Sequence, residues 1–167
     1  MRIDLFSIPI FIGNIDSEKL VIEDETFDKA WWSKTTSSYN NNHKNKLQDE
    51  STKYLLKNIA SLLKDKIKNP FEVQLSNIWS NKYDKNDYQE EHIHSNSHFS
   101  FIIYKNVKES RTKFISAWRD IITAYEMNNL FCENFSVECR SNQICVFPSF
   151  VKHLVSKNKS ILIIFYH

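Results

Sequence analysis

The clearest pattern along the chain is a helical one. Apolar residues recur at spacings of three and four, which predicts an amphipathic helix; they are Tyr54, Leu55, Ile59, Leu62, Leu63 and Ile67. Asp49 or Ser51 suits the helix start, because short polar side chains accept hydrogen bonds from its first free N–H groups. Asn69-Pro70 ends it, because a residue before proline disfavours the helical conformation. We expect a helical support at about residues 49–69.

Beyond the helix the pattern changes to short β-rich runs. These strand candidates cover residues 71–83, 88–94, 97–105, 136–140, 144–147, 150–155 and 161–166. Residues 112–127 are ambiguous, because Trp118, Ile121 and Tyr125 lie at helical spacing. An earlier β-rich run at residues 2–14 is broken by Pro9, which is typical of an edge strand or an entry segment.

One helix followed by many short strands predicts an α+β fold that is mainly β. The length of 167 residues, 41% of them hydrophobic, suits one domain with a sizeable core. We therefore expect a single domain at residues 1–167, in which the helix flanks a β-sandwich or barrel at about residues 70–167.

Charge and hydropathy exclude two classes of partner. Lys and Arg number 22 and Asp and Glu number 20, so a net charge of +2 gives no strong attraction to nucleic acid or to an anionic membrane. The longest apolar runs, at residues 99–104 and 161–166, are too short to span a bilayer. We expect neither nucleic acid nor a membrane as a partner.

The number of glycines and the spacing of the cysteines exclude some classes of binding site. Gly13 is the one glycine in the sequence, so glycine-rich phosphate-binding loops are excluded. Asn is abundant where turns are expected, and it tolerates the left-handed conformation that glycine usually supplies. Cys132, Cys139 and Cys145 form no Cys-x-x-Cys pair, which favours reduced thiols and a cytoplasmic location.

The strongest chemical signal is a cluster of histidines. His92 and His94 are two residues apart in a predicted strand, so their imidazoles would share one face. His153 lies on a later predicted strand, and a strand pairing beside the first two would give three metal ligands with open positions for substrate or water. The alternative is that these are half-exposed polar residues of an edge strand.

Two blocks of sequence resemble the metal motifs of cupins. His92-x-His94 is followed by His98 at the place where cupins commonly have Glu. The segment from Pro148 to His153 is similar to the second motif, Pro-x-Gly-x-x-His, with Phe150 in place of its glycine.

A closer resemblance is to the small 2-oxoglutarate–Fe(II) oxygenases found in marine bacteria and their phages. It rests on WSNKYDKNDYQEEHIHSNSHFSFIIY at residues 79–104 and on ICVFPSFVKHLV at residues 144–155, which match a His-x-His block and a Phe-Pro-Ser-x-x-x-His block in order and separation. The opening IDLFSIPIFIGNID at residues 3–16 also resembles the start of that family.

This resemblance implies a double-stranded β-helix, a jelly-roll or cupin-like barrel. It implies Fe(II) held by His92, His94 and His153, with 2-oxoglutarate as co-substrate. The usual iron triad is two histidines and one carboxylate, so His94 would take the place of the carboxylate. Glu90, Glu91 or His98 are alternatives for the third ligand, and either glutamate could instead accept a hydrogen bond from a ring N–H of a ligand.

The resemblance also implies a site for the distal carboxylate of 2-oxoglutarate. Members of the class usually bind it with an Arg on the last strand, where this chain has Ser160 with Lys159 beside it. Arginines from elsewhere could substitute: Arg111, Arg119 and Arg140. Asn96, Ser100 and Tyr104 are further co-substrate candidates, and the polar residues expected to line the cavity are Asn81, Gln89, Asn96, Ser97, Ser100 and Tyr104.

The function implied is hydroxylation of an unknown small molecule or peptide side chain by a non-haem oxygenase. One alternative is a cupin-like metalloenzyme that does not use 2-oxoglutarate. Another is a metal-free jelly-roll protein with a binding or structural role. A homodimer is compatible with each, and a phage-encoded protein would work in the host cytoplasm.

Overall fold

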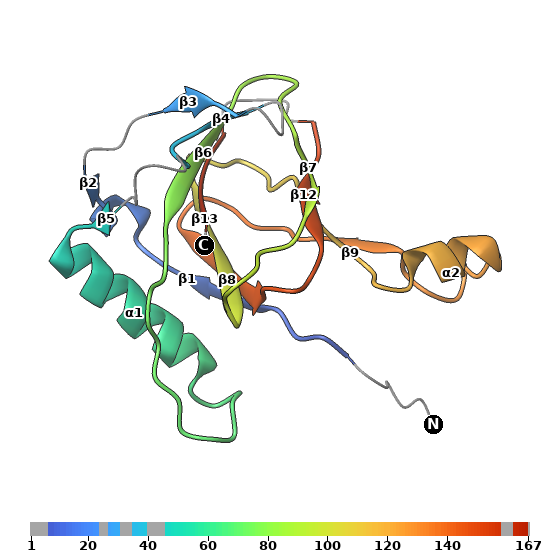
Figure 1. Cartoon of the computed structure of the whole chain (residues 1–167), viewed down its shortest axis with the longest axis horizontal. Coiled ribbons are helices and arrows are strands. Elements are labelled where there is room, and N and C mark those ends of the chain that lie inside the picture. Colours follow the sequence, from blue (N-terminus) through green and yellow to red (C-terminus); the bar gives the residue numbers. More distant parts are fainter. Residues whose placement is uncertain (1–6, 24–26, 31–34, 40–45, 158–161, 167) are drawn as a thin grey trace.

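Two β-sheets are the main elements of the described chain in this computed structural model (Figure 1). The structure describes residues 7–23, 27–30, 35–39, 46–157 and 162–166. The larger sheet has the strand order β1-β11-β8-β13-β6-β4-β3. Its members are β1 (Phe11–Asn14), β3 (Asp28–Lys29), β4 (Thr36–Ser37), β6 (Trp79–Tyr83), β8 (Phe99–Lys105), β11 (Gln143–Pro148) and β13 (Leu162–Tyr166).

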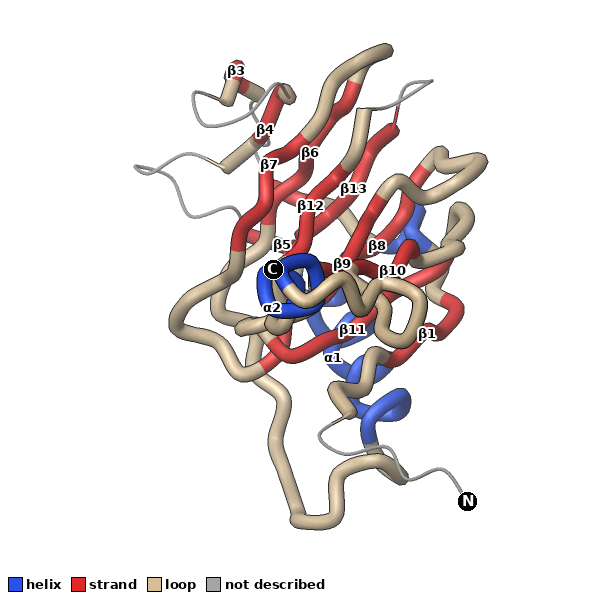
Figure 2. Tube along the Cα trace, turned by 90° about the vertical axis from the view of Figure 1, so that its right-hand side faces the viewer, coloured by secondary structure: helices blue, strands red, loops and turns tan. Residues whose placement is uncertain are grey.

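The smaller sheet faces the larger one across an apolar interior. Its order is β10-β9-β12-β7, formed by β7 (Gln89–His92), β9 (Thr112–Ile115), β10 (Asn134–Ser136) and β12 (His153–Val155). A separate pair joins β2 (Ile22–Glu23) to β5 (Lys46–Leu47). Figure 2 shows the strands as layers, with the helices outside them. The prediction of a mainly β chain with few helices is confirmed.

Strands β8 and β11 are apolar on both faces because they are covered on both sides. Ile102 and Tyr104 of β8 face the interior between the sheets, where Phe147 of β11 and Phe114 of β9 join them. The alternate residues, Phe101 and Ile103 among them, face a second core. The alternation follows from the strand period of two residues.

The helix α1 (Asp49–Leu63) closes that second core. Its buried residues, Leu55, Ile59 and Leu63, lie on the stripe that the sequence predicts. Gly13 of β1 approaches the helix closely, because a Cβ there would lie 3.3 Å from Leu62 Cδ1. No helix in the described residues is long and apolar enough to cross a membrane.

Several predicted boundaries differ from the structure. The helix ends at Leu63 and not at residue 69, since a turn follows in which the N–H groups of Lys66 and Ile67 both donate to the Leu63 carbonyl oxygen. Only the last part of residues 71–83 is a strand, β6. The ambiguous stretch 112–127 contains both β9 and a short helix, α2 (Arg119–Ala124).

Asparagine replaces glycine at the left-handed turns, as the composition predicted. Residues with positive φ in the described chain are Asn86, Asn96, Asn106, Glu126 and Asn142. Asn106 and Asn142 lie next to the adjoining ends of β8 and β11, and the Asn142 N–H donates to the Tyr104 carbonyl oxygen. Asn tolerates this conformation better than most residues, so tight turns form without glycine.

The first prediction concerns the packing of α1. Leu55→Ala is expected to lower the free energy of unfolding by about 2–5 kcal/mol, because it empties a fully buried position. Lys57→Ala, on the exposed face of the same helix, is the matched control and is expected to change it by less than about 0.5 kcal/mol. Urea unfolding followed by circular dichroism measures both, and equal effects of the two substitutions would contradict the assigned helix face.

Candidate metal centre

Antiparallel pairing of β7 with β12 places two histidines side by side. His92 and His153 are directly opposite each other in the register of this pair. Residues in such positions have neighbouring side chains on one face of the sheet. His94 lies two residues beyond β7, where its backbone N–H donates to the Ser149 carbonyl oxygen at 3.1 Å. The chain segment after β7 is therefore tied to the segment before β12.

The pairing register between β7 and β12 shifts by one residue, and the polar side chains of β7 have different surroundings on either side of the shift. His153 pairs with His92 and Val155 with Gln89, so β7 has one residue more than β12 over this interval. Such a bulge changes the direction of the side chains around it. Gln89 and His92 both line one cavity, whereas the Glu91 carboxylate pairs with Arg119 and with Lys152.

The three imidazoles meet inside the fold. One nitrogen from each of His92, His94 and His153 lies within 4.8 Å of the others. The Nε2 atoms of His94 and His153 are 3.2 Å apart. Two nitrogens bound at right angles, each roughly 2.1 Å from a divalent ion, would be about 3 Å apart. The separation therefore suits neighbouring positions around one metal ion.

Hydrogen bonds at Nδ1 fix the ring orientation of His92 and His153. His92 Nδ1 lies 2.7 Å from the Glu90 carbonyl oxygen, and His153 Nδ1 lies 3.0 Å from the Val151 carbonyl oxygen. A carbonyl oxygen only accepts, so each Nδ1 bears the proton and each Nε2 presents a lone pair, which in His153 faces His94 Nε2 at 3.2 Å. His92 Nε2 is buried without a hydrogen-bond partner among the described residues. A cation would satisfy this atom, so the donor set fits a metal.

Burial disfavours the charged form of His92 and His153. Removal from water lowers the pKa of His92 from its ordinary value of 6.5. The pKa of His153, which is fully buried, falls well below 6.5, because of its burial first and of the neighbouring His92 and His94 second. Only a neutral imidazole can donate its lone pair to a metal, so the environment favours the binding form.

The other predicted ligand candidates lie elsewhere. A hydrogen bond from Arg119 lowers the pKa of the Glu91 carboxyl, which is also paired with Lys152 at 2.9 Å. Glu90 meets the His92 ring through its backbone oxygen and not through its carboxylate. His98 is exposed and lines a second, larger cavity of about 580 Å³ beside α1. Among the described residues, the three-member cluster contains no carboxylate.

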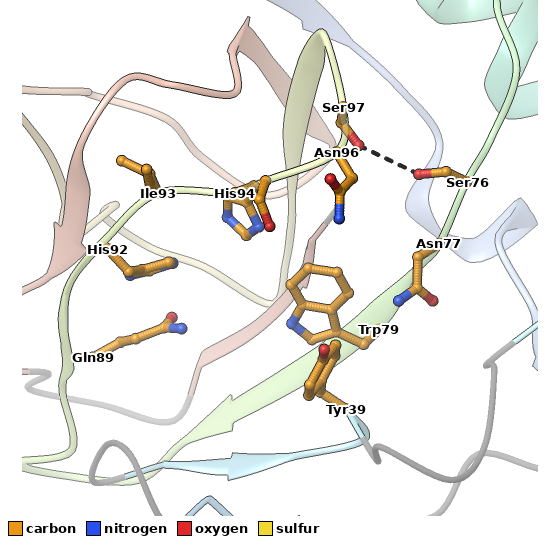
Figure 3. Close-up of a pocket in the computed structure, with 11 residues that line it drawn as sticks. Tyr39, Ser76, Asn77, Trp79, Gln89, His92, Ile93, His94, Asn96 and Ser97 are labelled. Carbon is orange, nitrogen blue, oxygen red and sulfur yellow. Dashed lines mark hydrogen bonds between the residues drawn. The ribbon is translucent and has the colours of Figure 1, made fainter.

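A cavity of about 420 Å³ opens beside His92 and His94 (Figure 3). Its lining is polar with two aromatic rings, Tyr39 and Trp79. The Trp79 ring lies 5.5 Å from that of His94, measured between centroids. The other lining residues are Ser76, Asn77, Gln89, Ile93, Ser95, Asn96 and Ser97.

A buried polar cluster adjoins this cavity. The Tyr83 hydroxyl donates to Gln89 Oε1 at 2.5 Å, and Asn81 Nδ2 lies 3.3 Å from both of these oxygens. Asn81 Oδ1 is buried without a hydrogen-bond partner in the described part of the chain. Gln89 and Asn81 were expected from the sequence to line the cavity, but Tyr83 was not, because an aromatic residue in a strand also suits the core.

The predicted co-substrate residues are dispersed. Asn96 lines the cavity. The Ser100 hydroxyl lies 2.8 Å from that of Ser149, and the Tyr104 hydroxyl donates to Thr112 Oγ1 at 3.1 Å. Lys159 and Ser160 lie outside the described residues.

None of the substitute arginines lines the cavity. Arg119 is paired with Glu91, Arg111 is paired with Glu109, and Arg140 is exposed.

Comparison with known proteins gives one family. The model of the family described as "Putative 2OG-Fe(II) oxygenase" matches residues 77–161, which is just over half of the chain and includes all three histidines. No curated protein matches the sequence at a significant level.

Solved structures show the same fold at low identity. A 2OG-Fe(II) oxygenase-family oxidoreductase from Burkholderia pseudomallei is 13% identical, with a TM-score of 0.55, over 90% of this chain and 74% of that one. HygX from Streptomyces hygroscopicus, solved with nickel, 2-oxoglutarate and hygromycin B, is 10% identical, with a TM-score of 0.52, over 95% and 82%. Together with the family match, these structures support the predicted cofactors, Fe(II) and 2-oxoglutarate.

The second prediction concerns pH. The metal-free protein is expected to lose stability as the pH falls from about 7.5 to about 5.5, by on the order of 1 kcal/mol per unit. His153 takes up a proton in the unfolded chain below its ordinary pKa of 6.5 but resists it in the folded one, so the unfolded state binds more protons over this range. Urea unfolding in the presence of a chelator measures the slope. His153→Gln should flatten it and His98→Gln should not; an unchanged slope in His153→Gln would contradict the assignment.

Proposed function

Since the chain belongs to the 2OG-Fe(II) oxygenase family, we propose that it hydroxylates a small molecule or a peptide side chain in a reaction that consumes 2-oxoglutarate and dioxygen. The observation that supports this most directly is the convergence of three imidazoles beside an open cavity. We propose His92, His94 and His153 as the iron ligands, each through Nε2. Iron with bound 2-oxoglutarate would supply the activation of dioxygen for C–H oxidation.

The protein's own contribution would be to hold the ligands in place before the metal binds. His92 and His153 are fixed by backbone acceptors at Nδ1, which set both the tautomer and the ring orientation. His94 packs against Trp79 and against the His153 ring, whose centroid is 5.0 Å away. Little side-chain reorganisation would then be needed when iron enters, which strengthens binding.

An all-histidine ligand set would change the charge of the centre. Two histidines and one carboxylate leave a divalent ion with one net positive charge, whereas three neutral imidazoles leave two. The greater charge of the centre would attract an anionic co-substrate more strongly. The three neutral ligands would bind the iron itself less strongly than a set that contains a carboxylate. The proposal therefore includes a stronger mutual dependence between iron and 2-oxoglutarate than a carboxylate-containing triad would give.

We propose the polar cluster of Asn81, Tyr83 and Gln89 as part of the co-substrate site. Gln89 lines the cavity with His92 and His94, Asn81 and Tyr83 are hydrogen-bonded to Gln89, and their amide and hydroxyl groups can donate hydrogen bonds to a carboxylate. Lys159 and Ser160 remain proposed partners on the approach to β13, and Asn96 remains one at the cavity wall. Ser100 and Tyr104 would act behind this lining, since their hydroxyls are already bonded to other residues.

The substrate would approach through the cavity itself. Its rim offers amide and hydroxyl groups, and the rings of Tyr39 and Trp79 form an edge-to-face pair with centroids 5.1 Å apart. Such a wall suits a polar molecule or side chain with a flat or apolar part. The two facing sheets would correspond to the double-stranded β-helix of the predicted fold. The free thiols fit the predicted cytoplasmic location, and an origin in marine bacteria or their phages stays a prediction.

The all-histidine centre also favours a second candidate, a cupin-like metalloenzyme that does not use 2-oxoglutarate. Three histidines complete a metal site with no contribution from an oxoacid. Binding of 2-oxoglutarate to the iron-loaded protein separates the two candidates.

The third prediction tests the metal ligands. Addition of Fe(II) and then 2-oxoglutarate without oxygen is expected to give a visible charge-transfer band in the unmodified protein. His92→Ala, His94→Ala and His153→Ala should each weaken Fe(II) binding by more than the 10–100-fold typical of a residue that only supports a ligand. His98→Ala is the control and should keep both the band and the affinity.

The outcomes of this titration are separable. Iron binding without the band would favour the metalloenzyme that does not use 2-oxoglutarate. Absence of divalent metal binding at micromolar concentration would exclude both candidates and favour the metal-free protein.

The fourth prediction tests the co-substrate site. Gln89→Leu is expected to raise the apparent Kd for 2-oxoglutarate roughly tenfold, because one hydrogen bond to a charged group contributes about 1.5 kcal/mol or more. The affinity for Fe(II) alone should stay the same. Gln48→Leu, at an exposed position before α1, is the control. An unchanged Kd in Gln89→Leu, measured from the charge-transfer band, would remove Gln89 from the proposed site.

A further inference from the structure

A segment that projects from the smaller sheet after β9 carries six exposed large apolar side chains. This α2 arm, residues 116–136, contains α2, which extends away from both sheets (Figure 1), and ends with β10 at the edge of the smaller sheet. Six of its large apolar side chains are 47–74% exposed: Trp118, Ile121, Tyr125, Leu130, Phe131 and Phe135. By contrast, Ile122 of the same helix is buried.

The exposed apolar area is similar to the largest apolar patch of a typical monomer. An aromatic side chain contributes roughly 150–250 Å², so the four aromatic residues, each more than half exposed, present on the order of 500 Å². Ile121 and Leu130 add to this area. The largest apolar patch on a typical monomer is about 300–600 Å². A stable protein–protein interface buries about 800 Å² on each partner, so the exposed apolar side chains of the arm would provide more than half of the area that one partner contributes.

The arm is held in place, and several of its polar groups are already satisfied. Arg119 joins it to β7 through the ion pair with Glu91. Glu133 Oε1 accepts hydrogen bonds from the Thr123 hydroxyl at 2.8 Å and from Asn128 Nδ2 at 2.7 Å. The arm therefore combines its exposed apolar side chains with the exposed carboxylates of Asp120, which is paired with Arg119, and Glu126.

An open sheet edge lies in the same region. β10 is the last strand of the smaller sheet, and its outer side pairs with no strand in the described part of the chain. All three of its residues are exposed. An unpaired strand edge is a template for pairing with another chain. Pairing about a two-fold axis would join β10 to β10 of a second molecule and would bring the two apolar surfaces together.

We propose that the α2 arm is the contact surface of a symmetric homodimer. An isologous contact needs a surface that complements itself, and an apolar patch beside an open antiparallel edge meets that need. The partner is a second copy of this chain, which presents an equal apolar area and the same strand edge. This proposal is independent of the proposed enzymatic function, because the metal centre contributes no residue to the interface.

Sedimentation velocity of the full chain across the micromolar range tests the proposal. The expected mass is twice 19.9 kDa. The double variant Leu130→Asp with Phe131→Asp should sediment as a monomer, because it places carboxylates in the interface. Ile8→Asp and Val21→Asp are matched controls, since these side chains are 46% and 43% exposed outside the arm, and they should stay dimeric.

A label at Cys132 gives a second readout. Cys132 lies in the arm and is exposed, whereas Cys139 and Cys145 are buried, so a thiol-reactive nitroxide attaches selectively. Dipolar coupling between the two labels is expected in the wild-type dimer and should be lost in the double variant. A monomer at all concentrations, a dimer without coupling, or equal dissociation of the control variants would overturn the proposal. Circular dichroism and Fe(II) binding show whether each variant is folded.

Discussion

The candidate site depends on the pairing of β7 with β12. This antiparallel contact joins two segments that are far apart in the sequence, and it sets His92 opposite His153 with the ring centroids 4.2 Å apart. The backbone bond from His94 to Ser149 extends the same contact and brings in the third ring. The position of each imidazole is thus determined by main-chain hydrogen bonds, which are stiffer than side-chain contacts alone.

The two cores around this pairing contribute to the burial that lowers the pKa of His92 and His153. β8 and β11 are covered on one face by α1 and on the other by the smaller sheet, so the interior between the sheets is mainly apolar. Desolvation disfavours imidazolium, and it leaves His92 Nε2 without a hydrogen-bond partner among the described residues. The same burial makes the metal-free site costly, and a bound cation would relieve that cost.

The bulge in β7 decides which polar residues reach the cavity. It leaves Gln89 and His92 on the cavity wall, while Glu91 is paired with Arg119 and Lys152. A carboxylate that is one residue away from a ligand in the sequence is therefore engaged elsewhere. The ion pair also attaches the α2 arm to the strand of the metal centre, so the proposed dimer contact and the proposed active site share one structural support.

The sequence by itself determined the local features: the buried stripe of α1, the β-rich remainder, the turns built on Asn, and three histidines as ligand candidates. These follow from periodicity and side-chain chemistry, which act over a few residues. It did not determine the end of α1, the projection of α2 from the ambiguous stretch, or the participation of Tyr83 in a polar cluster with Gln89. Only the tertiary structure decided these, because strand register, the bulge in β7 and the burial of each side chain arise from contacts between segments that are distant along the chain.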